Sequence, residues 1–458
     1  MTRIAIIGGG PAGYEAALVA VQLEAEVTLI ERDGVGGQCV LADCVPSKTL
    51  IATSEAMTSF SHADRVGITT HGEVSTRLSE VNARVKALAL AQSDDIGSAL
   101  SRQGVQVLHG SARLAGAGKV EVSGDDGTQV LGADAVLLAT GARPRVVPGA
   151  ETDGERILDW RQLYDLPDLP EHLVVVGSGV TGAEFAGAYE AMGSQVTLVS
   201  SRERVLPGED SDAAELLQSV FLRRGMEICR GRAAGVTRTP AGVRVQLTDG
   251  SVVQGSHCLM TVGSVPNTAG LGLAEVGVRL TDSGFVDVDR VSRTSVPGVY
   301  AAGDCTGVLM LASVAAMQGR IAMWHALGEA VQPLRLRTVS ANVFTDPQVA
   351  SVGVSQKQVE SGEVAASAVT LPLGTNARAK MQGVTDGFVK FFCHPGSGTV
   401  LGGVVVAPTA SELIMPISMA VQHGLTVDQV AHTFAIYPSL SGSLTEAARR
   451  LMLHGADR

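Results

Sequence analysis

The sequence predicts an α/β fold with two Rossmann-like nucleotide-binding domains, each a three-layer ββα arrangement, followed by an α+β C-terminal domain. Three observations lead to this prediction. The chain opens with an apolar run, a glycine-rich turn, an alanine-rich helical stretch and a second apolar run, and the same order returns near residue 173. A mixed set of strands and helices follows a proline-bearing segment near residue 335. The length of 458 residues suits about three domains.

The first unit carries a dinucleotide-binding pattern. A strand is expected over residues 3–7, a helix up to Leu23 and a second strand over residues 26–30. Gly8, Gly10 and Gly13 lie between the first strand and the helix, and Glu31 ends the second strand about 20 residues further on. A helix N-terminus offers free N–H groups to a pyrophosphate, and a glutamate at this place accepts hydrogen bonds from a ribose. The pattern therefore predicts a dinucleotide site.

The second unit repeats the pattern with Gly177, Gly179 and Gly182. Its second strand, residues 195–199, is followed by Ser200, and then by a stretch that contains Ser201, Arg202 and Arg204. A carboxylate at the strand end would repel a 2′-phosphate, whereas arginines attract one. We therefore expect NADPH to be favoured over NADH. The alternative is that these arginines are solvated surface charges.

Further elements follow from the apolar periodicity. Residues 75–103 are expected to form a long helix, residues 110–132 a β-meander, and residues 134–141 a buried strand that ends at a glycine. Another apolar strand runs over residues 298–304 and closes with Gly-Asp304. These elements complete the first nucleotide-binding unit.

Composition excludes several classes of protein. Six cysteines are too few for a disulfide scaffold in a chain of this length. A net charge of −11 argues against a nucleic-acid partner. No apolar run approaches the roughly 18 residues of a membrane span, and no signal peptide opens the chain. We expect a cytoplasmic protein without integral membrane association.

Cys39 and Cys44 are the two closely spaced cysteines. On one regular helix their side chains would diverge by about 140°, so a disulfide between them would need a distorted turn. Strained disulfides are the reducible ones. Two buried, inert thiols are the alternative.

Taken together, the motifs resemble those of the flavoprotein pyridine nucleotide-disulfide reductases, which include dihydrolipoyl dehydrogenase, glutathione reductase, mercuric reductase and soluble transhydrogenase. The resemblance implies a discontinuous FAD-binding domain over residues 1–148 and 271–335, an NAD(P)H-binding domain over 149–270, and a homodimer interface domain over 336–458. The motifs that carry it are GGGPAG ending at Gly13, GGQC ending at Cys39, CVPSK ending at Lys48, ATGARP ending at Pro144, GSGVTGAE ending at Glu184, AAGD ending at Asp304 and VFTDPQVASVG ending at Gly353.

The resemblance also assigns roles to residues. Cys39 would exchange with substrate, Cys44 would face the flavin, and Lys48 and Glu184 would form an ion pair beside the flavin N5 atom. The expected contacts to FAD are Gly8, Gly10, Gly13, Glu31, Arg32, Gly37, Lys48, Ala112, Thr140, Gly141, Asp304 and Ala312. The expected contacts to NAD(P)H are Gly177, Gly179, Gly182, Glu184, Ser201, Arg202 and Gly263. No metal is implied.

The chain departs from the disulfide-reducing members near its C-terminus. Those members carry a histidine directly before a proline and a glutamate five residues later, which the partner subunit offers as the general base. Here Tyr437 and Gly442 occupy these two positions. A tyrosine that titrates near pH 10 cannot shuttle protons as an imidazole does, so reduction of disulfide substrates should be poor. His432, five residues upstream, is the one candidate to replace the base.

Transfer of electrons from NAD(P)H through FAD to a quinone needs neither a thiolate nor a strong base. The ending YPSLSG of this chain resembles that of a quinone-reductase branch of the family. We therefore predict an NAD(P)H:quinone reductase in which Tyr437 lies at the catalytic site. Mercuric reductase is set aside because no cysteine follows Cys393. A dihydrolipoyl dehydrogenase-like disulfide reductase, a soluble transhydrogenase and a non-enzymatic NADPH/FAD redox-sensing scaffold remain alternatives.

Overall fold

The computed structural model describes residues 1–69, 71–72, 74–125 and 127–452. The chain divides into two compact units. The first comprises Met1–Thr49, Asn82–Arg145 and Gly263–Arg335, and the second comprises Leu50–Val81, Val146–Val262 and Leu336–Arg458. None of the described helices is both long and apolar enough to cross a membrane.

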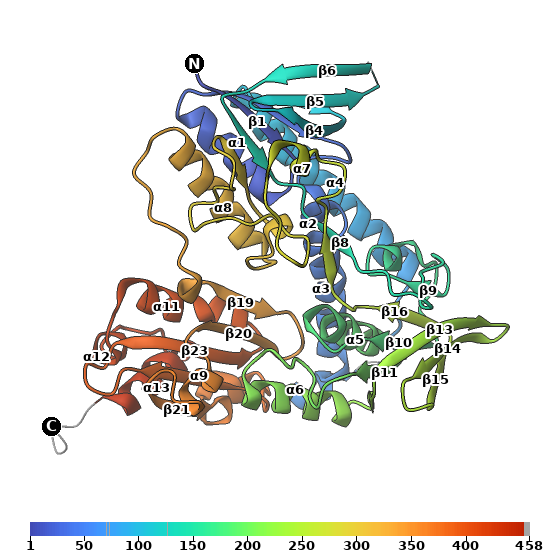
Figure 1. Ribbon diagram of the computed structural model, residues 1–458. Helices are drawn as coiled ribbons and strands as arrows, with labels where there is room; N and C mark the ends of the chain where they lie inside the picture. Colours follow the sequence, from blue (N-terminus) through green and yellow to red (C-terminus); the bar gives the residue numbers. More distant parts are fainter. Residues whose placement is uncertain (70, 73, 126, 453–458) are drawn as a thin grey trace. The chain divides into compact units, whose positions relative to one another are not determined.

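The first unit is built on a five-stranded parallel sheet (Figure 1). Every side chain of its strand β7 is buried and apolar, as expected for a parallel strand covered on both faces. The strand order is β18 (Val299–Ala301), β7 (Ala135–Leu138), β1 (Arg3–Ile7), β2 (Glu26–Glu31) and β3 (Gln106–His109).

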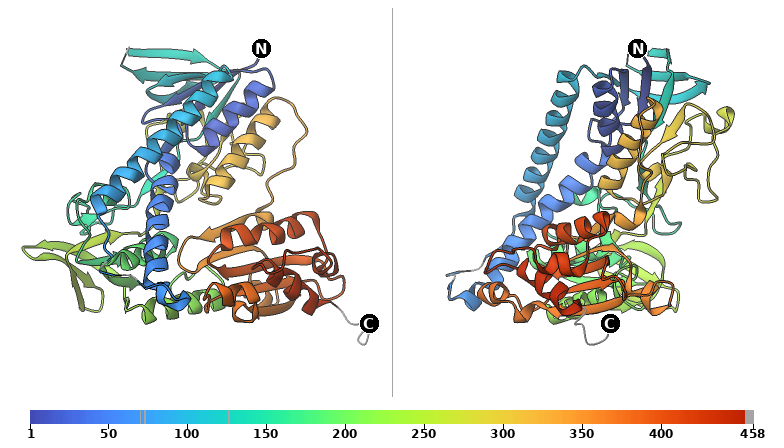
Figure 2. Two further views of the ribbon diagram at one scale, coloured as in Figure 1. Left: turned by 180° about the vertical axis from the view of Figure 1, so that it is seen from behind. Right: turned by 90° about the vertical axis from the view of Figure 1, so that its left-hand side faces the viewer.

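Alternation along β1 separates two cores in this unit. Ile4 and Ile6 pack against the helices α1 (Pro11–Gln22), α4 (Leu78–Arg102) and α8 (Ala312–Ala326). Both views of Figure 2 show α1 between α4 and α8. Ala5 and Ile7 instead pack against the antiparallel meander of β4 (Ser111–Gly116), β5 (Lys119–Gly124) and β6 (Gly127–Gly132). The result is a ββα sandwich in which the parallel sheet is the middle layer.

The second unit contains the repeat of this arrangement. Its parallel sheet has the order β12 (Glu227–Arg230), β11 (Gln195–Ser200), β10 (His172–Val176), β16 (His257–Met260) and β9 (Ile157–Leu158). One face packs against the meander β13 (Ala233–Thr239), β14 (Gly242–Leu247) and β15 (Val252–Gly255). Helix α5 (Val180–Met192) packs on β10 and β11, and α6 (Ser211–Arg223) follows β11 in the chain.

The C-terminal part of the second unit is an α+β layer. Its antiparallel sheet has the order β19 (Ser340–Val343), β20 (Gln348–Gly353), β23 (Val400–Ala407), β22 (Phe388–Cys393) and β21 (Ser367–Pro372). Helices α11 (Ala410–His423) and α13 (Gly442–Leu451) cover one face with an apolar core. The predicted fold class is thus confirmed.

Shorter elements connect these layers, and α3 has residues in both units. They are α2 (Gly37–Leu41), α3 (Cys44–Ser61), η1 (Ala63–Val66), β8 (Ala142–Pro144), η2 (Gln162–Asp165), β17 (Ser264–Pro266), α7 (Leu273–Val276), η3 (Asp304–Thr306), η4 (Leu336–Thr338), α9 (Gln356–Glu360), η5 (Leu373–Thr375), α10 (Ala377–Met381) and α12 (Val427–Ala431).

The long helix expected over residues 75–103 and the meander expected over residues 110–132 are both present. The backbone between Cys39 and Cys44 departs from a regular helix, as a disulfide between them would require. Cys39 lies in α2, whereas Cys44 is the first residue of α3, so the two cysteines do not share a regular helix. The break falls at Ala42, whose φ of −140° is not helical.

Candidate active site

The first glycine turn is shaped by close contacts. A Cβ atom at Gly8, whose φ is +107°, would lie 2.3 Å from the carbonyl oxygen of Ala139, and one at Gly13 would lie 1.9 Å from that of Gly8. Gly10 is different because no described atom lies within 4 Å of its Cβ position. Gly10 is also the N-cap of α1, so the open space adjoins unbonded N–H groups of the helix. This is the cradle that a pyrophosphate requires.

Glu31 is held beside this turn by backbone donors. Its Oε2 accepts from the N–H of Gly9 at 2.6 Å, and its Oε1 accepts from Arg32 and Asp33 at 2.7 Å each. Arg32 is exposed and pairs with Asp33 at 3.0 Å. A carboxylate fixed at the end of β2 is the group that binds a ribose hydroxyl in this type of fold.

The two cysteines adjoin the same turn. The N–H of Gly36 donates to Gly9 O at 2.8 Å, and a Cβ at Gly37 would lie 2.8 Å from Cα of Gly10. Helix α2, which carries Cys39, therefore begins against the glycine turn. Both thiols are free and half-buried, and a side-chain hydrogen bond with Cys39 together with burial raises the pKa of Cys44.

Lys48 lies one turn after Cys44 in α3, and its positive charge acts in the opposite direction, lowering the pKa of Cys44. Sequence reasoning missed a third neighbour, Tyr14 in α1. Burial raises the pKa of Tyr14, and the charged forms of Cys39 and Cys44 raise it further. The charges of both cysteines thus act on Tyr14, a residue to which no local motif points.

Asp304 lies where the strand β18 turns into η3. Burial and the nearby Asp43 raise its pKa to about 6. The turn is held by Gln318, which is 1% exposed and accepts from the N–H of Gly303 at 2.9 Å, and by Thr306, whose hydroxyl donates to Gly303 O at 2.7 Å. Gln318 is a residue of α8 that the sequence did not single out.

The remaining predicted contacts of the first cofactor are spread over the same unit. Thr140 donates to Asn267 O at 2.8 Å, and Gly141, at φ +67°, has no described atom within 4 Å of its Cβ position. Ala112 is half-buried in β4, and Ala312 begins α8. The ends of β1, β2 and β7 lie together at one edge of the parallel sheet, because β1 pairs in parallel with both β2 and β7.

The second glycine turn has the same contacts as the first. A Cβ at Gly177 would lie 2.4 Å from Thr261 O, one at Gly182 would lie 1.9 Å from Gly177 O, and Gly179 is open. Thr261 Oγ1 donates within 3.0 Å to the carbonyls of Val176 and Gly177. Gly263, at φ +92°, accepts from the N–H of Arg145 at 2.9 Å and belongs to the first unit.

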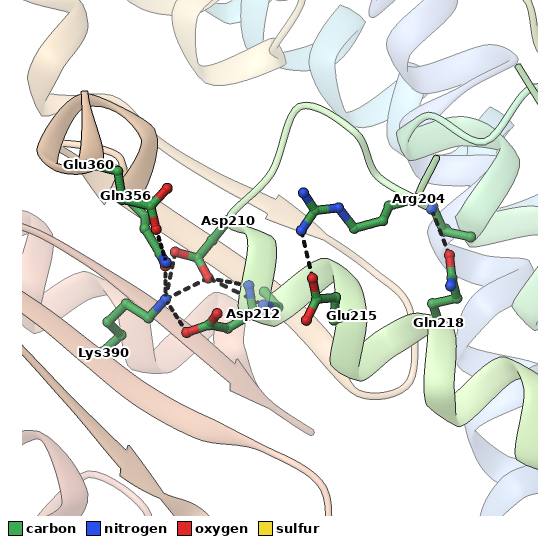
Figure 3. A network of polar contacts seen from close by, with 10 residues as sticks. Arg204, Asp210, Asp212, Glu215, Gln218, Gln356, Glu360 and Lys390 are labelled. Atoms are coloured by element: carbon green, nitrogen blue, oxygen red, sulfur yellow. Dashed lines mark hydrogen bonds and ion pairs between the residues drawn. The ribbon is translucent and has the colours of Figure 1, made fainter. Parts of the chain in front are cut away.

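A loop from Ser201 to Asp210 leads from β11 to α6 and carries the predicted 2′-phosphate residues. Ser201 and Arg202 are exposed, and Glu203, a carboxylate that the sequence argument passed over, is exposed between Arg202 and Arg204. Figure 3 shows Arg204 turned toward Glu215 of α6, at 2.8 Å. Of the two arginines, Arg202 is therefore the one whose side chain has no such partner among the described residues.

The loop is tied down at several points. The N–H of Val205 donates to Gln218 at 3.2 Å, and that of Leu206 donates to Ser178 O at 2.8 Å. Asp210 caps the N-terminus of α6 by accepting from the N–H groups of Asp212 and Ala213. The loop is thus a fixed platform for its exposed side chains.

Glu184 lies in α5 and is 4% exposed. Its Oε1 accepts from the N–H of Phe344 at 2.8 Å, a link to the C-terminal sheet. A small pocket beside it is lined in part by Glu55, whose pKa is raised by burial, and by Arg224 and Asp346, which pair at 2.6 Å.

Tyr437 is 86% exposed, and Gly442 is the first residue of α13. His432 is exposed at the end of α12, and its Nδ1 lies 2.7 Å from the carbonyl oxygen of Asp428, within its own helical turn. Phe434 and Ile436 are 104% and 81% exposed beside Tyr437. The segment from Phe434 to Tyr437 is therefore an exposed apolar surface of the described chain.

The chain contains two glycine turns of the same geometry. One lies beside a ribose-binding carboxylate and a pair of thiols, and the other lies beside a loop that carries two arginines. Together these features define a flavoprotein class of pyridine-nucleotide oxidoreductase. The chain belongs to the pyridine nucleotide-disulphide oxidoreductase family, whose model matches residues 2–319. The dimerisation domain of that family matches residues 339–448. The family uses FAD and NAD(P)H, and both cradles fit a dinucleotide.

Individual relatives are similar over their whole length. An "NAD(P)H dehydrogenase (quinone)" of Mycobacterium tuberculosis is 57% identical over 99% of this chain and 94% of its own. A dihydrolipoyl dehydrogenase of Chlorobaculum tepidum is 34% identical over 97% and 96%. The crystal structure of LpdA from Mycobacterium tuberculosis matches with a TM-score of 0.95 at 57% identity, covering 99% of this chain and 100% of that one.

Proposed function

We propose that this oxidoreductase passes electrons from NADPH, and less efficiently from NADH, to a quinone. The observation that carries the proposal is the pair Tyr437 and Gly442, which stand where disulfide-reducing members have their general base. A relative 57% identical is named NAD(P)H dehydrogenase (quinone), which supports the same acceptor.

The residues of the chain bind and orient the two nucleotides. The open position at Gly10 and the carboxylate of Glu31 would hold the pyrophosphate and ribose of FAD, and the space at Gly179 would hold the pyrophosphate of NADPH. FAD, when bound, takes a hydride from NADPH and passes two electrons to the acceptor. We assign Arg202 to the 2′-phosphate because its side chain is exposed on a fixed loop.

Lys48 and Glu184 are proposed to orient the reacting ring atoms as an ion pair. The Phe344 N–H holds one oxygen of Glu184, so that its carboxylate is fixed and buried. Replacing Glu184 with Gln should slow reduction of the flavin for every acceptor, because that half of the reaction is shared.

A second candidate is reduction of a disulfide through Cys39 and Cys44. The observation in its favour is that both thiols are free and hydrogen-bonded to each other. Relatives about one-third identical are named dihydrolipoyl dehydrogenase. The missing histidine-glutamate pair argues against efficient turnover on this route. Soluble transhydrogenase and a redox-sensing scaffold remain predictions of lower rank.

We further propose a homodimer through residues 336–458, in which the exposed segment from Phe434 to Tyr437 is covered by the second copy. The division into an FAD-binding domain (1–148 and 271–335) and an NAD(P)H-binding domain (149–270) belongs to the same proposal. The cytoplasmic location stays a prediction.

The test is a steady-state panel of menadione, lipoamide, glutathione disulfide and oxidised thio-NAD as acceptors, each with NADPH and with NADH. Quinone reduction should exceed disulfide reduction by at least about 100-fold, which is the lower range of what a general base contributes. Fast lipoamide turnover with slow menadione turnover would replace the quinone with a disulfide substrate. Negligible turnover with every acceptor would favour the sensor.

A further inference from the structure

We infer that Lys390, a residue of the C-terminal sheet, is a positioning residue for NADPH. It fixes the end of the loop from Ser201 to Asp210, the nucleotide loop, which carries the arginine assigned to the 2′-phosphate. This inference rests on the proposed function for its nucleotide, and it adds a contribution of the C-terminal sheet to nucleotide binding. Three features of the molecule support it: the strained backbone of the loop, the burial of Lys390 and the separate anchoring of α6.

The nucleotide loop contains a strained backbone position. Leu206 has a φ of +52°, although it precedes Pro207, and it is 1% exposed. A left-handed conformation is unfavourable for a bulky residue, and the residue before a proline prefers extended backbone. Leu206 O accepts from the N–H of Glu209 at 3.0 Å, so residues 206–209 form a closed turn. Such a conformation persists only where contacts outside the turn hold it.

The middle and the end of the loop are held by different parts of the chain. In the middle, the N–H of Leu206 donates to Ser178 O at 2.8 Å. At the end, Asp210 accepts from the ammonium group of Lys390 with both carboxylate oxygens, at 2.8 Å each (Figure 3). The C-terminal sheet therefore fixes the point at which the strained turn meets α6.

Lys390 is the one charged residue of its strand. All six residues of β22 are buried, and Lys390 is 2% exposed. An apolar residue would suit this position of the sheet, so the ammonium group is explained by its partners. Besides Asp210 these include Asp212, at 2.8 Å, and Gln356, and the ring of Phe388 lies 5.5 Å from Nζ. The contact with Asp210 is thus a specific link rather than a by-product of packing.

Helix α6 is also anchored independently of Lys390. At its other end, Arg223 pairs with Asp386 at 2.7 Å. The next residue, Arg224, pairs with Asp346 at 2.6 Å. Five residues of the helix are buried and apolar. Loss of the contact with Lys390 should therefore leave α6 in place and free only the loop, whose strained turn then relaxes. NADPH would have to order the loop again on binding, which lowers its affinity.

The experiment compares variants of the FAD-loaded protein by two measurements. Isothermal titration calorimetry gives the affinity for NADP⁺. Trypsin cleavage after Arg202 and Arg204, identified by mass spectrometry, reports opening of the loop. K390M should lose about tenfold in NADP⁺ affinity, as expected when a few residues must be ordered on binding, and its loop should be cleaved at least about tenfold faster. Flavin content and melting temperature serve as folding controls.

D210S breaks the same contact from the other side. Serine still caps α6, and Lys390 keeps Asp212 and Gln356 as partners, so this variant carries the test if K390M does not load FAD. It should show the same two effects. D210S/K390M should bind NADP⁺ no more than about threefold more weakly than either single variant, since both substitutions remove one contact.

V389A is the matched control for lost stability. Val389 precedes Lys390 in β22, is 0% exposed and packs in the apolar core on the other face of the sheet. Alanine leaves a cavity there but keeps the contact between Lys390 and Asp210, so NADP⁺ affinity and loop cleavage should stay within about twofold of the parent.

The inference is overturned if K390M and D210S keep their NADP⁺ affinity, if their loops are cleaved no faster than that of the parent, or if V389A shows the same changes. An unchanged NADP⁺ affinity in R202E would instead reject the assignment of the 2′-phosphate. Because no acceptor takes part, failure of the proposed quinone activity is seen separately in the steady-state panel.

Discussion

The Nζ atom of Lys390 lies 2.8 Å from both carboxylate oxygens of Asp210, and each of these side chains is 3% exposed (Figure 3). Asp212 at 2.8 Å and Gln356 are further partners of the ammonium group. Asp210 also caps α6, directly after the loop that carries Arg202. One buried ion pair therefore joins the C-terminal sheet to the end of the proposed nucleotide loop.

Removing one member of this pair should be costly, since it leaves the other charge buried without its partner. We expect K390M to lower the free energy of unfolding by about 3–5 kcal/mol, and D210N/K390M to lower it by less than the sum of the single variants. Urea unfolding of the four proteins measures both. Additive losses would mean that the two side chains do not depend on each other.

Arg202 is predicted to bind the 2′-phosphate. R202E should lower kcat/KM for NADPH by about 10- to 100-fold and change that for NADH by less than about threefold, because only NADPH carries the phosphate. E203Q is a matched control, since it removes a neighbouring exposed charge and should favour NADPH slightly. An unchanged NADPH to NADH ratio in R202E would make Arg202 a surface charge.

The thiols should be dispensable for quinone reduction. C39S/C44S is expected to keep menadione reduction within about tenfold of the parent, because no step on that route needs a thiolate. Loss of turnover in this variant, with flavin reduction by NADPH still normal in stopped-flow measurements, would show that the electrons pass through Cys39 and Cys44.

The missing base should be restorable. Y437H/G442E is expected to raise lipoamide reduction by at least about tenfold, if the thiols are positioned to use it. Gly442 has helical backbone, and among the described residues its Cβ position has only Ser439 Oγ within 4 Å, at 3.9 Å, so a Cβ is accommodated there. Y437F/G442E, which lacks an imidazole, is the control and should show no gain.

Asp304 should make the FAD-free protein less stable as the pH rises. Its folded pKa of about 6 lies above the ordinary value of 3.8, so the folded state favours the protonated form. The penalty is absent below pH 4, grows between pH 4 and 6, and is complete above pH 6, where it is on the order of 2–3 kcal/mol. D304N should therefore be more stable than the parent at pH 7.5 but equal to it at pH 4, as measured by urea unfolding of FAD-stripped protein. Equal stability at both pH values would remove Asp304 as the cause.

Local pattern was sufficient for several strands of the two nucleotide-binding units and for both glycine turns. Four positions of these turns need glycine because a Cβ would collide with atoms a few residues away or next to the adjacent strand; they are Gly8, Gly13, Gly177 and Gly182. Such local requirements are recognisable as a motif in the sequence. Apolar runs with period 2 or 3.6 likewise predicted β1, α4 and the meander.

Other features depend on residues far apart in the chain. Gln318 of α8 holds the turn before Asp304, and α8 packs closely on α1, because a Cβ at Gly319 would lie 2.1 Å from Ala12 O. In the sequence, Lys390 is a single charge within an apolar strand. Only the structure shows that β22 places this charge against Asp210.

The sequence by itself thus determined the fold class, the two dinucleotide-binding turns and the loss of the general base, since each of these features depends on residues close together in the chain. The tertiary structure alone decided that Cys39 and Cys44 lie on separate helices, that Arg204 pairs with Glu215, and that the hydroxyl groups of Ser178 and Ser200 lie 2.7 Å apart. The physical reason is that spacing along a chain specifies local backbone geometry, whereas the partners of a polar side chain are chosen by packing between elements.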